Sequence, residues 1–114
     1  MGKKKRINMM AMWKEFNPAA SKSIKEDFAN CEYANLAKIA DYLDNGQVTL
    51  VSAEYGSDII TNQKITNTYC IVTDGEYSWS NTLSYYVRKY NLRLPKEFED
   101  KILLKILEDD YTNA

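Results

Sequence analysis

The chain has 114 residues, of which 45% are hydrophobic and 27% charged, and its formal net charge is −1. These values are typical of one globular domain with its own core, and no apolar run approaches the roughly eighteen residues of a membrane-spanning helix. The sequence contains no histidine, which excludes Ser-His-Asp and Cys-His catalysis and the common zinc sites.

The charge is unevenly distributed along the chain. Four basic residues, Lys3, Lys4, Lys5 and Arg6, leave eleven bases against sixteen acids in the remainder, a net charge of −5. Residues 1–17 are predicted to form a basic, flexible arm, with Trp13 and Phe16 packing back against the domain. The acidic remainder argues against a main surface that binds phosphate groups.

A long helical pattern runs from Ser21 or Ser23 to Asn45, and Gly46 ends it as a C′ residue would. Its apolar positions shift in phase near residues 30–35, so two shorter helices remain possible. The two cysteines, Cys31 and Cys70, lie far apart in the sequence and are predicted to be buried thiols without a disulfide. This cysteine usage favours a cytoplasmic protein.

Short β-strands are predicted over Gln47–Tyr55, 59–61, Ile65–Thr73 and 76–79. Gly56 marks a break or a bulge, and Asp74-Gly75 predicts a type I′ hairpin turn. The short connections favour an antiparallel meander of three or four strands, because a parallel pair needs a longer crossover.

Two helices are predicted after the strands. Ser80 is a candidate N-cap, Asn91 can adopt the left-handed C-terminal conformation, and Pro95 opens the last helix. The first of these helices has one apolar face, formed by Leu83, Tyr86, Val87 and Tyr90. The sequence therefore predicts an α+β fold, a small antiparallel β-meander packed against helices in the order α-β-β-β-β-α-α. The domain is expected to span residues 18–110, with a frayed tail at 111–114.

No motif points to an enzyme or to a cofactor. The four glycines form no nucleotide-binding loop. Acidic residues near the strand ends, namely Glu54, Asp58, Asp74 and Glu76, could in principle converge on a magnesium ion or a sugar. Turn and solvated-edge roles account for them more simply, so we expect no catalytic residue, metal site or cofactor.

Tyrosine is abundant, with nine in the chain. Most of these side chains are expected in the core, but tyrosine, tryptophan and arginine also anchor protein interfaces. Tyr85 lies off the apolar face of its helix and is the first candidate for an exposed contact. The predicted partner-binding residues are Tyr77, Trp79, Tyr85, Arg88 and Lys89.

By elimination, the sequence predicts a non-enzymatic protein-binding module. The type expected is a small bacterial or phage inhibitor, of the immunity or anti-defence kind, that blocks another protein through an acidic, aromatic-rich surface. One alternative is a nucleic-acid-associated accessory protein that uses the Lys3–Arg6 arm. Another is a structural homodimer through the last helix, whose apolar circumference is wide, at Leu103, Leu104 and Leu107.

Overall fold

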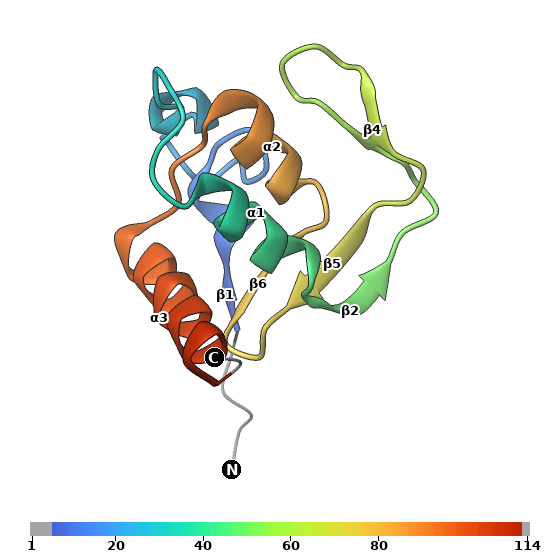
Figure 1. The fold of residues 1–114 in the computed structure, drawn as a ribbon. Coiled ribbons are helices and arrows are strands. Elements are labelled where there is room, and N and C mark those ends of the chain that lie inside the picture. Colours follow the sequence, from blue (N-terminus) through green and yellow to red (C-terminus); the bar gives the residue numbers. More distant parts are fainter. Residues whose placement is uncertain (1–5, 113–114) are drawn as a thin grey trace.

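The structure of the chain is a computed structural model that describes residues 6–112. Its helices and strands are, in chain order, β1 (Ile7–Asn8), the 3₁₀ helices η1 (Met9–Met12) and η2 (Ile24–Asp27), α1 (Leu36–Asp44), β2 (Gln47–Val51), β3 (Gly56–Ser57), β4 (Lys64–Thr66), β5 (Cys70–Thr73), β6 (Tyr77–Ser80), α2 (Leu83–Tyr90) and α3 (Lys96–Thr112). Helices α1 and α2 lie in front of the sheet in Figure 1, and α3 runs beside them. This is the α+β fold that the sequence predicts.

The main sheet has four strands in the order β1-β6-β5-β2. The β5–β6 and β2–β5 pairs are antiparallel, but β1 runs parallel to β6. The prediction of a purely antiparallel meander is therefore wrong. The parallel pair arises because residues from the N-terminal segment, far from β6 in sequence, supply the edge strand, so the long crossover is the rest of the chain.

Most of the segment predicted as an N-terminal arm is part of the packed structure. Ile7 N–H donates to the carbonyl oxygen of Glu76 at 2.9 Å. The Trp13 side chain is fully buried, and its Nε1 donates to the Asp27 carboxylate at 2.8 Å. Residues 7–17 thus contribute to the sheet and core, whereas Lys3, Lys4 and Lys5 lie outside the described residues and Arg6 is exposed.

The segment before α1 differs from the predicted long helix. Ser23 and Glu26 form a capping box around the single turn of η2, and the chain then leaves helical geometry until Asn35, which has φ 66°. Because no helix buries residues 28–35, Cys31 is exposed, contrary to the prediction of a buried thiol, and Cys70 is half-buried.

The strand region folds into two separate parts. Strands β3 and β4 pair only with each other and form a hairpin that projects beside the main sheet (Figure 1). The strand predicted at residues 59–61 is instead a turn, in which the Asp58 carboxylate accepts hydrogen bonds from the N–H groups of Ile60 and Thr61. Side-chain acceptors of this kind compete with strand pairing.

The β5–β6 turn is not the predicted type I′ turn. Gly75 has φ 106°, but Asp74 has no positive φ. The Asp74 carboxylate instead accepts hydrogen bonds from the N–H groups of Glu76 and Tyr77, which organises a longer loop.

The helix ends follow the sequence in part. Asn91 adopts the predicted left-handed conformation with φ 56°, and α3 begins directly after Pro95. The N-cap of α2 is Thr82, not Ser80, which is the last residue of β6. Tyr111 lies in α3 and is exposed, and residues 113–114 are outside the described range.

Trp79 of β6 lies at the centre of the core. Its ring contacts Phe98 of α3 at a centroid distance of 5.4 Å and Tyr42 of α1 at 6.2 Å. Its Nε1 donates to the Leu43 carbonyl oxygen at 3.0 Å. One residue therefore ties the sheet to the C-terminal end of α1 and to the first turn of α3.

Gly46 connects α1 to β2 at a close approach to this core. A Cβ at this position would lie 2.9 Å from Cζ2 of Trp79 and 3.1 Å from Cβ of Val72. We expect Gly46→Ala to destabilise the protein by about 1 to 3 kcal/mol, the usual cost of overpacking. Urea unfolding measures this loss of free energy. The control is Gln47→Ala at the exposed neighbouring position, whose stability should stay within about 0.5 kcal/mol of wild type. An unchanged Gly46→Ala midpoint would show that Trp79 can move.

Candidate interaction surface

Two of the five predicted partner-binding residues lie in the core. Tyr77 is 7% exposed and Trp79 is 0% exposed. Tyr77 stacks on Phe98 with a centroid distance of 4.5 Å. Their prediction as surface contacts is wrong, because β6 is an inner strand whose aromatic side chains face the helices.

Tyr85 and Lys89 lie on α2 and belong to a cluster around a buried carboxylate, the Asp58 cluster (Asp58, Tyr85, Lys89 and Tyr90). The Asp58 carboxylate is fully buried and accepts hydrogen bonds from the hydroxyls of Tyr85 at 2.7 Å and Tyr90 at 2.6 Å. Lys89 Nζ lies 3.6 Å from the same carboxylate and donates to the Tyr85 hydroxyl at 2.9 Å. The cluster fastens the β3–β4 hairpin to α2.

The Asp58 cluster holds its carboxylate ionised. Burial alone would raise the pKa of Asp58, but the hydrogen bonds from Tyr90, Tyr85 and the backbone N–H groups of Ile60 and Thr61 outweigh burial and hold it well below its usual value. Sequence reasoning placed Asp58 among solvated acids and missed this role. The only available signal was the tyrosine pair at positions 85 and 90, whose hydroxyls need a partner when buried.

Arg88 lies on the side of α2 that faces α1. Its guanidinium bonds to the carboxylates of Asp41 at 2.8 Å and Asp44 at 2.9 Å, and Ser84 also donates to Asp44. Three of the predicted contact residues, Tyr85, Arg88 and Lys89, are thus brought together by the structure, but each already has partners within the chain.

A cleft of about 510 Å³ lies between α2 and the β3–β4 hairpin, lined by Asp44, Ile65, Thr66, Asn81, Ser84, Tyr85, Arg88 and Lys89. Its polar groups are engaged inside the chain: Asn81, for example, bonds both the N–H of Cys70 and the carbonyl oxygen of Thr68. Within residues 6–112, every buried side-chain nitrogen and oxygen has a hydrogen-bond partner. The cleft therefore offers a ligand no unsatisfied buried polar group.

The four acidic residues considered for metal or sugar chemistry do not share one site. Asp58 lies in its own cluster. Asp74 accepts a hydrogen bond from the Tyr42 hydroxyl at 2.6 Å, and Lys101 Nζ lies 3.0 Å from both Asp74 and Glu76. Glu54 is exposed. In the described part of the chain, no three acidic or cysteine side chains are arranged as metal ligands.

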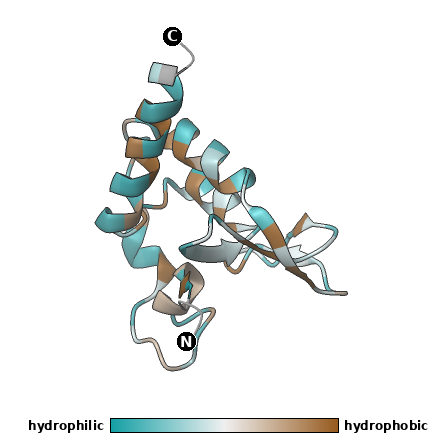
Figure 2. Cartoon of the chain, turned by 90° about the horizontal axis from the view of Figure 1, so that it is seen from below, coloured by the Kyte–Doolittle hydropathy of each residue, from teal (hydrophilic) through white to brown (hydrophobic). Residues whose placement is uncertain are grey.

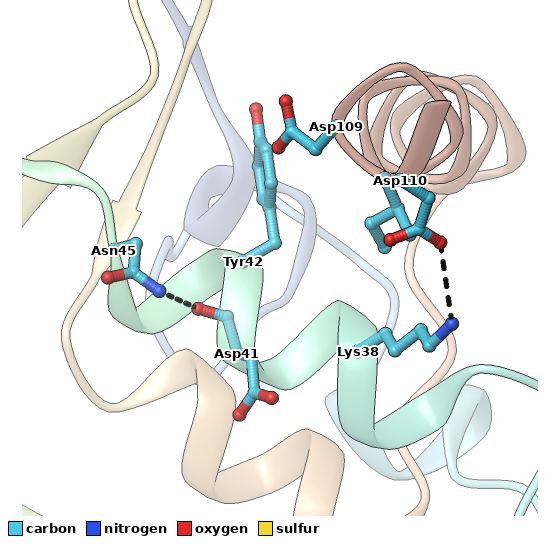
Figure 3. Close-up of a pocket in the computed structure, with 7 residues that line it drawn as sticks. Lys38, Asp41, Tyr42, Asn45, Asp109 and Asp110 are labelled. Carbon is cyan, nitrogen blue, oxygen red and sulfur yellow. Dashed lines mark hydrogen bonds and ion pairs between the residues drawn. The ribbon is translucent and has the colours of Figure 1, made fainter. Parts of the chain in front are cut away.

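An acidic concave surface lies between α1 and the C-terminal end of α3 (Figure 3). This acidic groove, of about 390 Å³, is lined by Lys38, Asp41, Tyr42, Asn45, Ile106, Asp109 and Asp110. The side chains of Asp41, Asp109 and Asp110 are 71%, 61% and 67% exposed. Asp109 and Asp110 reach the groove from α3, whereas the Asp41 carboxylate is directed away from them and is paired with Arg88 at 2.8 Å (Figure 3).

Tyr42 forms one wall of the acidic groove. Burial, the hydrogen bond to Asp74 and the negative charges of Asp74 and Glu76 raise the pKa of Tyr42 well above its usual value. The phenol therefore stays protonated at neutral pH, and the hydrogen bond to Asp74 holds its ring in place beside α3. A rigid aromatic wall loses little conformational entropy when a partner binds.

The outer face of α3 carries a row of exposed apolar side chains. Leu104, Leu107 and Tyr111 follow the helical spacing of three and four residues, and they are 59%, 65% and 86% exposed. Leu103, the third residue predicted for an oligomer surface, is half-buried against the core. Figure 2 shows apolar and polar bands alternating along this helix up to the C-terminal end.

The described helices include none that is both long and apolar enough to cross a membrane. Comparison of the chain with protein-family models, with curated proteins and with solved structures finds no match.

Proposed function

We propose that this chain is a non-enzymatic protein-binding module that uses the acidic groove to engage a basic surface of another protein. The single observation that carries the proposal is that Asp41, Asp109 and Asp110 line one groove together with Tyr42 and Ile106. Carboxylates around an aromatic wall suit a lysine or arginine side chain, whose stem is apolar and whose head is cationic.

Asp41 is already paired with Arg88 at 2.8 Å, but Asp109 and Asp110 keep their charge available. Lys38 Nζ is 3.9 Å from Asp110, and both side chains are more than half exposed, so this ion pair is weak. Lys105 pairs with Asp109 at 3.5 Å in an equally exposed position. A partner's arginine can displace such contacts at small cost, because a bidentate guanidinium–carboxylate contact is stronger than a single exposed ammonium pair.

The outer face of α3 adds apolar area. Leu107 and Tyr111 lie on the same helix as Asp109 and Asp110 and are largely exposed. An apolar and aromatic centre beside charged groups is the usual composition of a protein interface. The proposed docking surface is acidic and partly aromatic. Its residues belong to α1 and α3, whereas the sequence had pointed to Tyr77 and Trp79 on β6.

Within this proposal the protein is a cytoplasmic inhibitor of the bacterial or phage kind, which acts by covering a functional basic surface of its target. Electrostatic steering between opposite charges would speed the encounter and make its rate depend on salt. A nucleic-acid role through the Lys3–Arg6 arm remains the alternative that the experiment must separate.

The test compares capture of partners from nuclease-treated lysate by three tagged proteins. These are the wild type, a groove variant (Asp41→Asn, Asp109→Asn and Asp110→Asn), and a matched control that loses three exposed acids elsewhere (Glu32→Gln, Glu54→Gln and Glu97→Gln). Both variants change the net charge by the same amount. We expect one protein to be captured by the wild type and the control, with at least about tenfold weaker binding by the groove variant.

The purified partner is then titrated with each protein, and its own activity is measured. Equal weakening by groove variant and control would contradict the proposal, since it would reduce the effect to overall charge. Deletion of residues 1–6 is expected to leave binding unchanged. Loss of binding with that deletion, together with nucleic acid in the untreated eluate, would favour the basic arm instead.

A further inference from the structure

Strand β2 (Gln47–Val51) is an open edge of the main sheet, and all five of its residues are exposed. Val48, Leu50 and Val51 are 52%, 62% and 62% exposed. The strand contains no charged residue and no proline, the usual features that prevent an edge from pairing with another chain. Its one irregularity is a bulge between Val48 and Leu50.

The hydrogen bonds around β5 show which of its residues face β2. Ser52 N–H donates to the carbonyl oxygen of Tyr69, so Tyr69 faces the β2 side. Asn81 N–H donates to the carbonyl oxygen of Cys70, so Cys70 faces β6. In an antiparallel sheet this direction alternates from one residue to the next.

The alternation identifies the free groups of β2. Val72, two residues after Cys70, also faces β6. Val48 pairs with Val72 and Val51 pairs with Cys70, so neither receives a hydrogen bond from β5 through this ladder. The N–H and C=O groups of Val48 and Val51 therefore point to the open edge.

We propose that a second copy of this chain pairs with this edge, β2 against β2, antiparallel about a two-fold axis between Thr49 and Leu50. Val48 of each copy then lies opposite Val51 of the other. Both residues turn their backbone groups outward, so each of the two pairs is of the hydrogen-bonded kind. The two four-stranded sheets become one continuous sheet.

The edge is self-complementary, which selects a second copy over a strand of another protein. Val48 and Val51 of one copy pair with Val51 and Val48 of the other, so both copies contribute the same residues, as an isologous interface requires. Because β2 carries no charged side chain, its pairing with a second copy places no acid opposite another within the strands, although both bodies are acidic.

The association is expected to be weak. Two hydrogen-bonded pairs and a few aliphatic side chains make a small interface, and interfaces below about 1,200 Å² in total typically form transient complexes. We expect a monomer at about 10 μM and a substantial dimer fraction at roughly 1 mM.

Sedimentation velocity over this concentration range tests the proposal. Val51→Pro removes one outward N–H but no hydrogen bond to β5, and proline is tolerated at such edge positions. We expect this variant to remain monomeric throughout the range. Leu104→Glu, on the outer face of α3, is the control and is expected to dimerise like the wild type.

Hydrogen exchange supplies an independent readout. The amides of Val48 and Val51 should exchange rapidly in dilute wild-type protein and become protected at high concentration. If Val51→Pro loses the native circular dichroism spectrum, Val48→Lys with Leu50→Lys takes its place, because edge lysines prevent pairing without breaking the ladder.

A wild-type chain that stays monomeric at the highest concentration would overturn the proposal, as would a dimer that survives the β2 variants. A dimer lost in Leu104→Glu but kept in Val51→Pro would assign self-association to α3. Protection of Val48 and Val51 that appears only with a captured partner, the chain alone being monomeric, would assign the edge to that partner and also refute the second copy.

Discussion

Replacement of Asp58 by alanine is expected to lower the free energy of unfolding by about 3 to 5 kcal/mol. The change removes the acceptor of four hydrogen bonds, from the hydroxyls of Tyr85 and Tyr90 and the N–H groups of Ile60 and Thr61. These four donors then lose their acceptor at a buried site. Urea unfolding should show a lower midpoint with an unchanged slope.

Two comparisons sharpen this result. Glu54→Ala, at an exposed position two residues before β3, should change the stability by less than about 0.5 kcal/mol. Asp58→Asn keeps an acceptor for the backbone donors but loses the charge, so its effect should lie between the two. A loss below about 1 kcal/mol in Asp58→Ala would show that the hairpin is not fastened to α2 through this carboxylate.

The same variants test the acid dependence of stability. The pKa of Asp58 is lower in the folded state than in the unfolded state, where it is near the ordinary value of about 3.9. The folded protein therefore binds fewer protons in acid, and the contribution of Asp58 is fully present above the unfolded value. It is lost as the pH falls below that value toward the folded pKa, and this part of the acid slope should be absent in Asp58→Asn.

Trp79→Ala is expected to cost about 3 to 5 kcal/mol, the range for removing a large buried aromatic side chain. Trp79 is fully buried, contacts Phe98 and Tyr42, and donates to the Leu43 carbonyl oxygen. Its removal leaves a cavity between the sheet, α1 and α3, together with an unsatisfied carbonyl group. Thermal unfolding followed by circular dichroism measures the loss.

A milder change keeps the test informative if the alanine variant does not fold. Trp79→Phe retains much of the ring volume but loses the indole N–H, so an intermediate loss of about 1 to 3 kcal/mol is expected. Near wild-type stability of both variants, combined with loss of partner capture, would restore Trp79 to the docking surface and contradict its place in the core.

The local sequence determined much of the secondary structure. The β-branched segments at Gln47–Val51 and Cys70–Thr73 form strands, and the spacing of Leu83, Tyr86 and Val87 marks the buried face of α2. Asn91 ends that helix in the left-handed conformation. These signals depend on residues within one or two turns of each other, so no information from distant residues is needed.

Predictions failed where a short-range pattern allowed two outcomes. The segment 28–35 has a partly helical pattern, but Asn35 adopts a left-handed conformation and the chain remains irregular. Residues 59–61 have strand propensity, but the Asp58 carboxylate captures their N–H groups in a turn. At residues 59–61 a polar side chain supplied a competing conformation that propensity does not include, whereas Asn35 interrupts the helical pattern through its left-handed backbone, without a side-chain cap.

The surface that we propose is of the kind that composition indicated, but its residues are not those predicted from the sequence. Composition indicated an acidic surface with aromatic groups, whereas the choice between buried and exposed aromatics depends on which face of β6 the helices cover. Tyr77 and Trp79 alternate with polar residues, and that pattern predicts a two-sided strand without saying which side is wet. The acidic groove joins Asp41 to Asp109 and Asp110, residues almost seventy positions apart.

The sequence by itself determined the fold class, the main strands and helix faces, the acidic character of the body and the absence of histidine chemistry. Only the tertiary structure decided that residues 7–8 supply a parallel edge strand, that Asp58 is buried under two tyrosines, and that β2 is left open. The physical reason is that propensity and periodicity arise from neighbours along the chain. Burial, ion pairing and edge exposure depend instead on which distant segments pack together, a choice made by the summed contacts of the whole core.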